Sequence, residues 1–236
     1  MTMALALRCK DGIVLATDGK VTRASTSYRT VARIWQRTNK THHVPPHVLV
    51  AGAGELALIH AAVDAAAQLP DDERAKGIDG VVPAIRQAIV AARAEGVSRY
   101  ASIYGKEAAP EHAPRAYFLV VAATPEPRLV YVSEDADVED QTHLGYAATG
   151  SGDLIVHVRM QPWDTSRLSV EQGAILAYGL IKDTIDSGTF RVSDPVQVWS
   201  VRTGEAPVEW DEARTEKLGE RYHAFRQAIV DLLART

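Results

Sequence analysis

The stretch TMALALRCKDGIVLATD, residues 2–18, decides the fold. Two short apolar runs, Thr2–Arg8 and Ile13–Asp18, lie on either side of Lys10-Asp11-Gly12. An Asp-Gly pair between two apolar runs is a strong signal for a β-hairpin. The chain is therefore predicted to open with two antiparallel strands.

After this hairpin, the next hundred residues are predicted to contain two polar segments, a strand and two helices. Residues 20–47 are polar and are expected to be irregular, and Pro45-Pro46 extends the chain before a strand at Val48–Ala51. Two helices should follow, the first of them ended by Pro70. Residues 105–115 contain two prolines and mixed charge, which favours an exposed loop. The apolar positions expected to face the core are Leu56, Ile59, Val63 and Ala66 in the first helix, and Val82, Ile85, Ile89 and Ala92 in the second.

The second half of the chain returns to strands and then to helices. Ser169-Val170-Glu171-Gln172 has the capping-box pattern, so a helix should begin there and run to about Lys182. A helical tail is expected over about 211–236, with its apolar positions at Leu218, Tyr222, Phe225, Ile229 and Leu232. The strands are expected at Tyr117–Ala122, at Leu129–Ser133, near Leu144–Ala148 and at Val196–Val201. This order predicts an α+β protein in which two sheets are stacked between helical layers, with residues 1–236 forming a single domain.

Composition excludes several classes of protein. The chain is 46% hydrophobic and 24% charged, and its net charge of −4 argues against a nucleic-acid binder that works by neutralising phosphates. Cys9 is the single cysteine, which excludes an intrachain disulfide and a thiolate zinc site. The apolar run 116–123 is too short to span a membrane, and Met3–Leu7 is too short for a signal peptide. We therefore expect a cytoplasmic protein with no membrane partner.

Thr2 is the residue that carries the most chemical information. Initiator methionine is generally removed before a small side chain, and removal of Met1 would give Thr2 a free α-amino group. Such an amine has an ordinary pKa of about 7.7–8.0 and can accept a proton near neutral pH. A threonine hydroxyl is a weak nucleophile that needs an adjacent base. By itself, however, a Met-Thr start can occur by chance.

The surroundings of Thr2 resemble the proteasome β-subunit superfamily of N-terminal nucleophile hydrolases. Asp18 follows Thr2 by sixteen residues, and Lys40 and Gly54 are fourteen residues apart. Thr149-Gly150-Ser151-Gly152 is similar to the family's serine turn, and Leu168–Glu171 to the start of its fourth helix. The resemblance extends from Thr2 to about Val201 and is patchy between residues 75 and 140. It implies a four-layer αββα sandwich, here with an added C-terminal helix.

The same resemblance implies a role for each matching residue. The charge of Lys40 would favour the nucleophilic form of Thr2, and Asp18 would hold that ammonium. The amide of Gly54 would stabilise the oxyanion, with Gly52 as the second choice, and Ser151 would relay protons to the Thr2 amine. The ordinary alternatives are a solvated Lys–Asp surface pair, close packing at a helix start and a plain Gly-Ser-Gly turn.

The sequence departs from the family pattern in three places. The segment between Asp18 and Lys40 is longer than usual, so the lysine assignment requires a loop insertion; Arg33 or Arg37 could fill that place but would share a proton less readily. The family's Asp-x-x-Ser-Gly is altered over residues 183–188, which leaves Asp183 or Asp186 as the partner beside Ser187. Only Met1 precedes Thr2, a feature similar to the HslV-type and Anbu-type bacterial branches.

The family position also implies a substrate pocket beside Thr2. The expected walls are Val21, Thr38, His42, Gly52 and Leu56, and a glycine at position 52 would leave the pocket deep.

The remaining motifs favour structural roles. His42, His43 and His47 could bind a metal, but adjacent histidines on a strand point apart, so no metal site is expected. Cys9 is expected to be a small core residue, and the Tyr222/Phe225 stripe to be packing or a subunit contact.

These observations favour a threonine-type peptidase or amidase that needs no cofactor. Its expected partners are a peptide or unfolded-protein substrate, further copies of the chain in a ring and an unfoldase. Two alternatives remain open: an amidase of the same class that acts on a small molecule, and a catalytically silent structural subunit of a ring.

Overall fold

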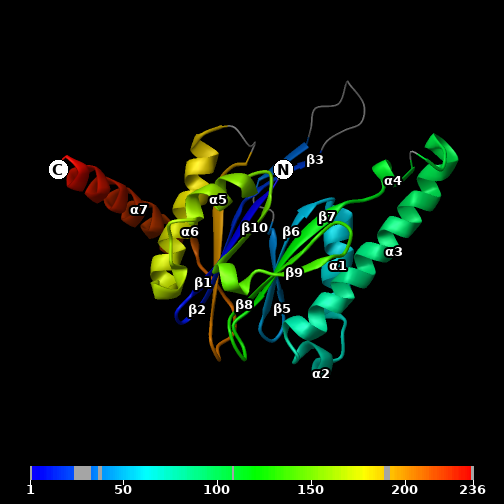
Figure 1. Ribbon diagram of the computed structural model, residues 1–236, viewed down its shortest axis with the longest axis horizontal. Helices are drawn as coiled ribbons and strands as arrows, with labels where there is room; N and C mark the ends of the chain where they lie inside the picture. The colour runs from blue at the N-terminus through cyan, green and yellow to red at the C-terminus, as the bar shows by residue number, and fades with distance from the viewer. Residues whose placement is uncertain (1, 24–32, 37–38, 108, 189–191, 235–236) are drawn as a thin grey trace.

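The computed structural model describes residues 2–23, 33–36, 39–107, 109–188 and 192–234. Two five-stranded antiparallel sheets lie face to face at its centre (Figure 1). The first sheet has the order β10-β1-β2-β11-β12, and the second the order β5-β6-β7-β8-β9. The first consists of β1 (Met3–Cys9), β2 (Gly12–Asp18), β10 (Tyr146–Gly150), β11 (Val196–Arg202) and β12 (Val208–Glu209). The second consists of β5 (Thr41–Val44), β6 (Val48–Gly54), β7 (Ala116–Ala122), β8 (Arg128–Val132) and β9 (Val138–Asp140).

Helices cover the outer face of each sheet. On the second sheet lie α1 (Leu56–Ala67) and α3 (Ile78–Tyr104), with the short α2 (Asp71–Arg74) between them and α4 (Ala109–His112) after them. On the first sheet lie α5 (Asp153–Met160) and α6 (Val170–Asp186), and α7 (Glu212–Leu233) extends away from the body (Figure 1). Single 3₁₀ turns occur at Thr142–Leu144 and Thr165–Arg167. The predicted αββα sandwich with a C-terminal helix is confirmed.

The alternation of side chains along β1 explains the layering. Met3, Leu5 and Leu7 pack against the helices of the first sheet, whereas Ala4 and Ala6 face the second sheet. The space between the sheets is filled by small and branched side chains, among them Ala4, Ala6, Leu15, Leu49, Ala51 and Leu119. Because both faces of β1 and β2 are covered, nearly every residue of the opening hairpin is buried. Cys9 is buried in this core, as expected, and burial raises its pKa to about 12.

Several expectations about local structure need correction. Residues 20–47, expected to be irregular, contain the β3–β4 hairpin (Lys20–Arg23 with Arg33–Gln36) and β5. The expected 105–115 loop contains α4. Leu56 is exposed because the buried face of α1 is formed by Leu58, Ile59, Ala62, Val63 and Ala66. In α7 only the part near the body packs: Leu218 and Tyr222 are buried, whereas Phe225, Ile229 and Leu232 are exposed.

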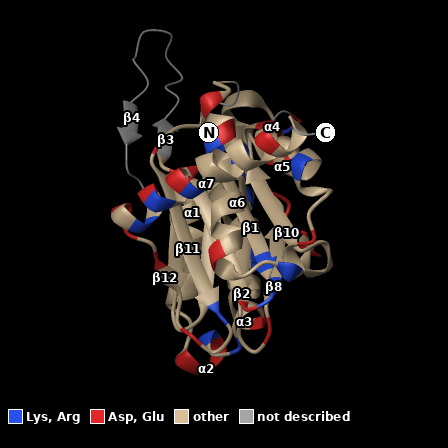
Figure 2. Cartoon of the chain, turned by 90° about the vertical axis from the view of Figure 1, so that its left-hand side faces the viewer, with Lys and Arg blue, Asp and Glu red and all other residues tan. Residues whose placement is uncertain are grey.

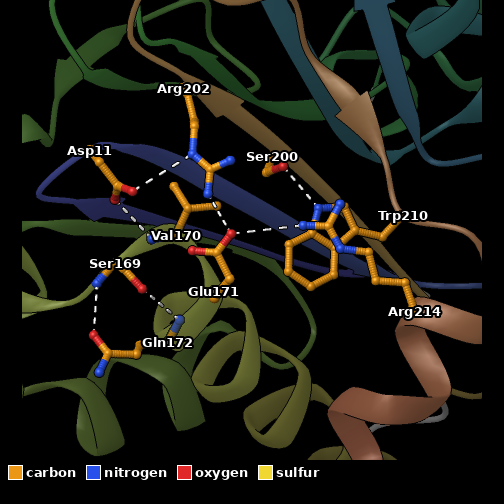
Figure 3. Close-up of polar contacts among 9 residues, drawn as sticks. All are labelled: Asp11, Ser169, Val170, Glu171, Gln172, Ser200, Arg202, Trp210 and Arg214. Carbon is orange, nitrogen blue, oxygen red and sulfur yellow. Dashed lines mark hydrogen bonds and ion pairs between the residues drawn. The ribbon is translucent and has the colours of Figure 1, made fainter.

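The capping box of α6 is confirmed and belongs to a larger polar network (Figure 3). Ser169 Oγ accepts the Gln172 amide at 3.3 Å, and Gln172 Oε1 accepts the Ser169 amide at 2.9 Å. The Arg202 guanidinium contacts both Glu171 and Asp11 (Figure 3). This network joins the β1–β2 turn, the start of α6 and β11. The helix ends at Asp186, a turn later than predicted.

The N-terminus marks one end of the sandwich. Figures 1 and 2 place it opposite α2, whose first turn contains Asp71, Asp72 and Glu73.

Among the described residues, no helix has the length and apolarity to cross a membrane.

Candidate active site

Thr2 is held at the end of β1 by the Ser151 turn. Antiparallel pairing places Met3 opposite Gly150, so that Thr2 and Ser151 meet at the end of the ladder. The Thr2 carbonyl accepts the Ser151 amide at 2.9 Å and the Ser151 hydroxyl at 3.4 Å. The chain start and the predicted serine turn are therefore in direct contact.

Gly150 makes this contact possible. Its φ is +97°, a conformation that side chains rarely adopt, and a Cβ atom there would lie 1.9 Å from the Thr2 carbonyl oxygen. A larger residue would push Thr2 away from Ser151. The glycine in the Thr149-Gly150-Ser151-Gly152 turn is thus required by the position of Thr2.

Asp18 and Lys40 form a buried ion pair beside the chain start. Lys40 Nζ lies 2.6 Å from Asp18 Oδ1, and both side chains are almost completely buried. The same oxygen accepts the Met3 amide at 2.8 Å, and Oδ2 accepts the Ser193 amide at 3.3 Å. A buried charge is tolerated when it is paired and hydrogen-bonded, and this carboxylate satisfies both conditions. The alternative of a solvated surface pair is wrong for these two residues.

Gln197 supports Lys40 and was missed by sequence reasoning. Its Oε1 accepts the Lys40 amide and the Thr17 hydroxyl, each at 3.3 Å, and its Nε2 donates to Asn39 Oδ1 at 3.0 Å. The side chain thereby ties β11 to the segment before β5. A single glutamine within a predicted strand offers no local signal of such a role.

Gly54 lies at the end of β6 that is nearest α1. The paired register of β5 and β6 ends at Thr41 and Ala51, so Gly54 extends past β5. Its φ is +121°, and a Cβ atom would lie 2.3 Å from the Arg115 carbonyl oxygen, which accepts the amide of the next residue, Glu55, at 2.9 Å. The backbone here admits only glycine without rearrangement.

Asp183 and Asp186, the two candidates for the partner beside Ser187, have different surroundings at the end of α6. Asp183 accepts hydrogen bonds from Tyr222 and Arg159, each at 2.8 Å, and from Arg226 at 3.2 Å. Asp186 is exposed and lies 3.2 Å from Lys182. We therefore interpret Asp183 as part of the contact of α6 with α5 and α7.

Thr184 is the residue of this turn that packs toward the serine turn. Its side chain is buried, and its methyl group would lie 3.4 Å from a Cβ atom on Gly152. The Ser187 hydroxyl donates to the Thr184 carbonyl at 2.8 Å at the C-terminal end of α6. A catalytic role for Ser187 stays a prediction.

The predicted pocket residues are brought together only in part. Val21 belongs to β3, where the structure does not describe the side chains, and Thr38 lies outside the described residues. Gly52 does not make the pocket deep, because Ile59 of α1 fills the space above it: a Cβ atom on Gly52 would lie 2.7 Å from Ile59. Leu56, 38% exposed, lies at the start of α1.

The adjacent histidines point apart, as the strand alternation predicts. The His42 ring meets His60 of α1 edge to face at 5.9 Å, whereas His43 faces Trp199 on the other side of β5. Burial, followed by the nearby His60, lowers the pKa of His42, and Asp64 acts in the opposite direction. His60 was not identified from the sequence.

Comparison with known proteins decides the family. The family model described as "Proteasome subunit" matches residues 2–194 of this chain, beginning at Thr2. The chain belongs to the proteasome subunit family. The resemblance to the proteasome β-subunit superfamily is thus confirmed.

A solved structure of similar fold is Anbu from Hyphomicrobium sp. strain MC1, a Gly-1 mutant. The two structures superpose with a TM-score of 0.67 at 17% sequence identity, covering 100% of this chain and 98% of that chain. At this identity the likeness shows the fold alone. A search of curated proteins finds no match.

Proposed function

We propose that this proteasome-family chain is a threonine-type endopeptidase or amidase whose nucleophile is Thr2 after Met1 is removed. The observation that carries the proposal is the set of contacts around Thr2. Its carbonyl is held by Ser151, and the amide of the following residue is held by Asp18, which also binds Lys40. A nucleophile needs a fixed position relative to its base and charge partner, and contacts that hold the backbone on both sides of the Thr2 carbonyl support such a role.

Acylation begins at the hydroxyl of Thr2. Its own α-amine accepts the hydroxyl proton, and Oγ attacks the substrate carbonyl. The developing oxyanion is stabilised by the Gly54 amide, and the amine then protonates the departing amino group. Water, activated by the same amine, hydrolyses the ester and regenerates Thr2. No step requires a metal or an organic cofactor.

Lys40 and Asp18 act on the electrostatics of this reaction. The Lys40 ammonium favours the more negative states of Thr2, and the buried Asp18 carboxylate keeps that ammonium in place. Ser151 is the proton relay between the amine and the reacting groups. Asp183 and Ser187 support the end of α6 and complete the proposed set.

We propose peptides or unfolded proteins as substrates, a homo-oligomeric ring as the working assembly, an unfoldase as a further partner and the cytoplasm as the location. Light scattering tests the ring: a particle several times the 25.6 kDa chain mass is expected. A monomer at micromolar concentration contradicts this part of the proposal.

Hydrolysis assays separate the proposal from its alternatives. Fluorogenic peptides and small acyl amides should be compared with wild-type, Thr2→Ser and Thr2→Ala proteins. Turnover of peptides that survives in Thr2→Ser and is abolished in Thr2→Ala supports the peptidase. Turnover of small amides alone supports the small-molecule amidase, and no turnover of either class supports a silent structural subunit.

A further inference from the structure

Two imidazoles, those of His42 and His60, lie side by side between β5, which begins after Lys40, and α1, which begins shortly after Gly54. His42 of β5 is half-buried, and its ring is 5.9 Å, centroid to centroid, from His60 of α1, in an edge-on arrangement. Asp64 follows His60 by one turn on α1. The two rings place up to four ring nitrogens, each able to donate when protonated, at one point of the surface between β5 and α1.

Both β5 and α1 begin close in sequence to residues of the proposed active site. Lys40, whose ammonium reaches Asp18, precedes His42 by two residues, a distance of about 7 Å along an extended chain. On the neighbouring strand, Gly54 ends β6 and Leu56 begins α1, and His60 follows Leu56 at the i+4 spacing of one helix face. Leu56 is exposed and lies one turn before His60 on α1. A substrate carbonyl at the Gly54 amide thus has Leu56 and the imidazole pair on one side.

We propose that His42 and His60 form a subsite for an acidic side chain, Asp or Glu, on the acyl side of the cleaved bond. This inference rests on the proposed function, because it places the acyl carbon at Thr2. The methylene groups of the substrate residue would lie against Leu56, and its carboxylate would accept hydrogen bonds from the two rings. A carboxylate that bridges two protonated rings gains charge-assisted hydrogen bonds, which are the strong ones.

The charges around the pair predict how this preference depends on pH. Burial lowers the pKa of His42, the nearby His60 of α1 acts in the same direction, and Asp64 of α1 acts in the opposite direction. From the opposing strand β6, Val50 pairs with His42 and has no charge, and Lys40, which precedes β5, is paired with Asp18. A bound carboxylate favours the protonated rings, so by linkage it must bind more tightly as the pH falls. The preference should therefore be greater at pH 6 than at pH 8.5.

Two peptides that differ only by Glu or Gln before the cleaved bond test the subsite. For the wild-type protein, the kcat/KM ratio of Glu to Gln should be about tenfold at pH 6 and should approach one at pH 8.5. His42→Gln or His60→Gln should reduce the ratio at pH 6 to about one. His60→Lys should keep the ratio above one at pH 8.5, because its charge persists there.

His43→Gln is the matched control. His43 is the next residue of the same strand but faces Trp199, with its Nε2 3.3 Å from the Pro46 carbonyl oxygen. Its substitution should leave the ratio unchanged. A wild-type ratio of one at pH 6, or a tenfold ratio that persists in His60→Gln, would overturn the subsite. Because His60 is exposed, its substitution tests the inference even where His42→Gln fails to fold.

A binding measurement separates this inference from the proposed function. In Thr2→Ala protein, histidine ring signals should be followed by NMR while the Glu or Gln peptide is added. The Glu peptide should raise the pKa values of His42 and His60, and the Gln peptide should not. Such shifts without any turnover by the wild-type protein would retain the subsite and refute the peptidase. Equal turnover of both peptides, without such shifts, would refute the subsite and retain the peptidase.

Discussion

The ammonium of Lys40 lies 2.6 Å from Oδ1 of Asp18, the oxygen that also accepts the amide of Met3 at 2.8 Å. One buried carboxylate therefore fixes a lysine and the backbone next to Thr2. The position of the proposed nucleophile and that of its charge partner depend on the same group.

Removal of the lysine charge should destabilise the fold. Lys40→Met leaves the Asp18 carboxylate buried without its partner, and the expected loss in free energy of unfolding is about 3–5 kcal/mol. Urea denaturation measures it. Lys76→Met, which removes an exposed i,i+3 partner of Glu73, is the matched control and should cause no measurable loss. The double variant Asp18→Asn with Lys40→Met should be more stable than Lys40→Met alone; equal stability would contradict the pairing.

Gly150 should be intolerant of any side chain. Gly150→Ala imposes the strain of a positive φ, about 1–2 kcal/mol, and also brings Cβ against the Thr2 carbonyl oxygen. Gly204→Ala has the same kind of strain (φ +81°) with open space around Cβ. Thermal unfolding should show a larger loss for Gly150→Ala, and acylation of Thr2 should fail in that variant alone. Equal losses in the two variants would contradict the proposed steric requirement.

The Glu171–Arg202 pair should make stability depend on acid pH. The hydrogen bond from Arg202 lowers the pKa of Glu171 below its ordinary value of about 4.3. For such a group the stabilisation is complete above the unfolded-state pKa and is lost as the pH falls through the folded-state pKa. The Glu171 side chain is 40% exposed, so solvent screening limits its contribution to about 0.5 kcal/mol.

Glu171→Gln should therefore be less stable than the wild-type protein at pH 7, and the difference should vanish toward pH 3. Urea titrations at both pH values measure this difference, and Glu126→Gln, in an exposed turn, controls for the loss of one carboxylate. A constant difference across this pH range would exclude the ion pair as its cause.

The parts of the fold predicted correctly were those with local signals. The opening hairpin follows from its Asp-Gly turn, and the start of α6 follows from its capping box. The β3–β4 hairpin and β5 were missed because these strands are only four residues long and mostly polar, so they give no clear alternation of apolar side chains. The exposed end of α7 was not foreseen, because a helical apolar stripe does not reveal whether anything packs against it.

The residues of the candidate site also divide into those that the sequence predicts and those that it does not. The spacing of Thr2, Asp18, Lys40 and Ser151 is visible along the chain. In the structure Ser151 contacts Thr2, and Asp18 binds both Lys40 and the amide of Met3, the residue after Thr2. Gln197 acts through side-chain geometry across two strands, which no local pattern records. Likewise, the filling of the space above Gly52 by Ile59 depends on how α1 packs on β6, which the family position alone does not specify.

The central claim is that Thr2 becomes the first residue and reacts with electrophiles. Intact-mass spectrometry of protein from the native host, with and without an electrophile that traps N-terminal threonine, tests it most directly. The account predicts the loss of one methionine residue and a single adduct, which persists in Lys76→Met and disappears in Thr2→Ala. A mature chain that retains Met1, or an adduct that remains in Thr2→Ala, would contradict it.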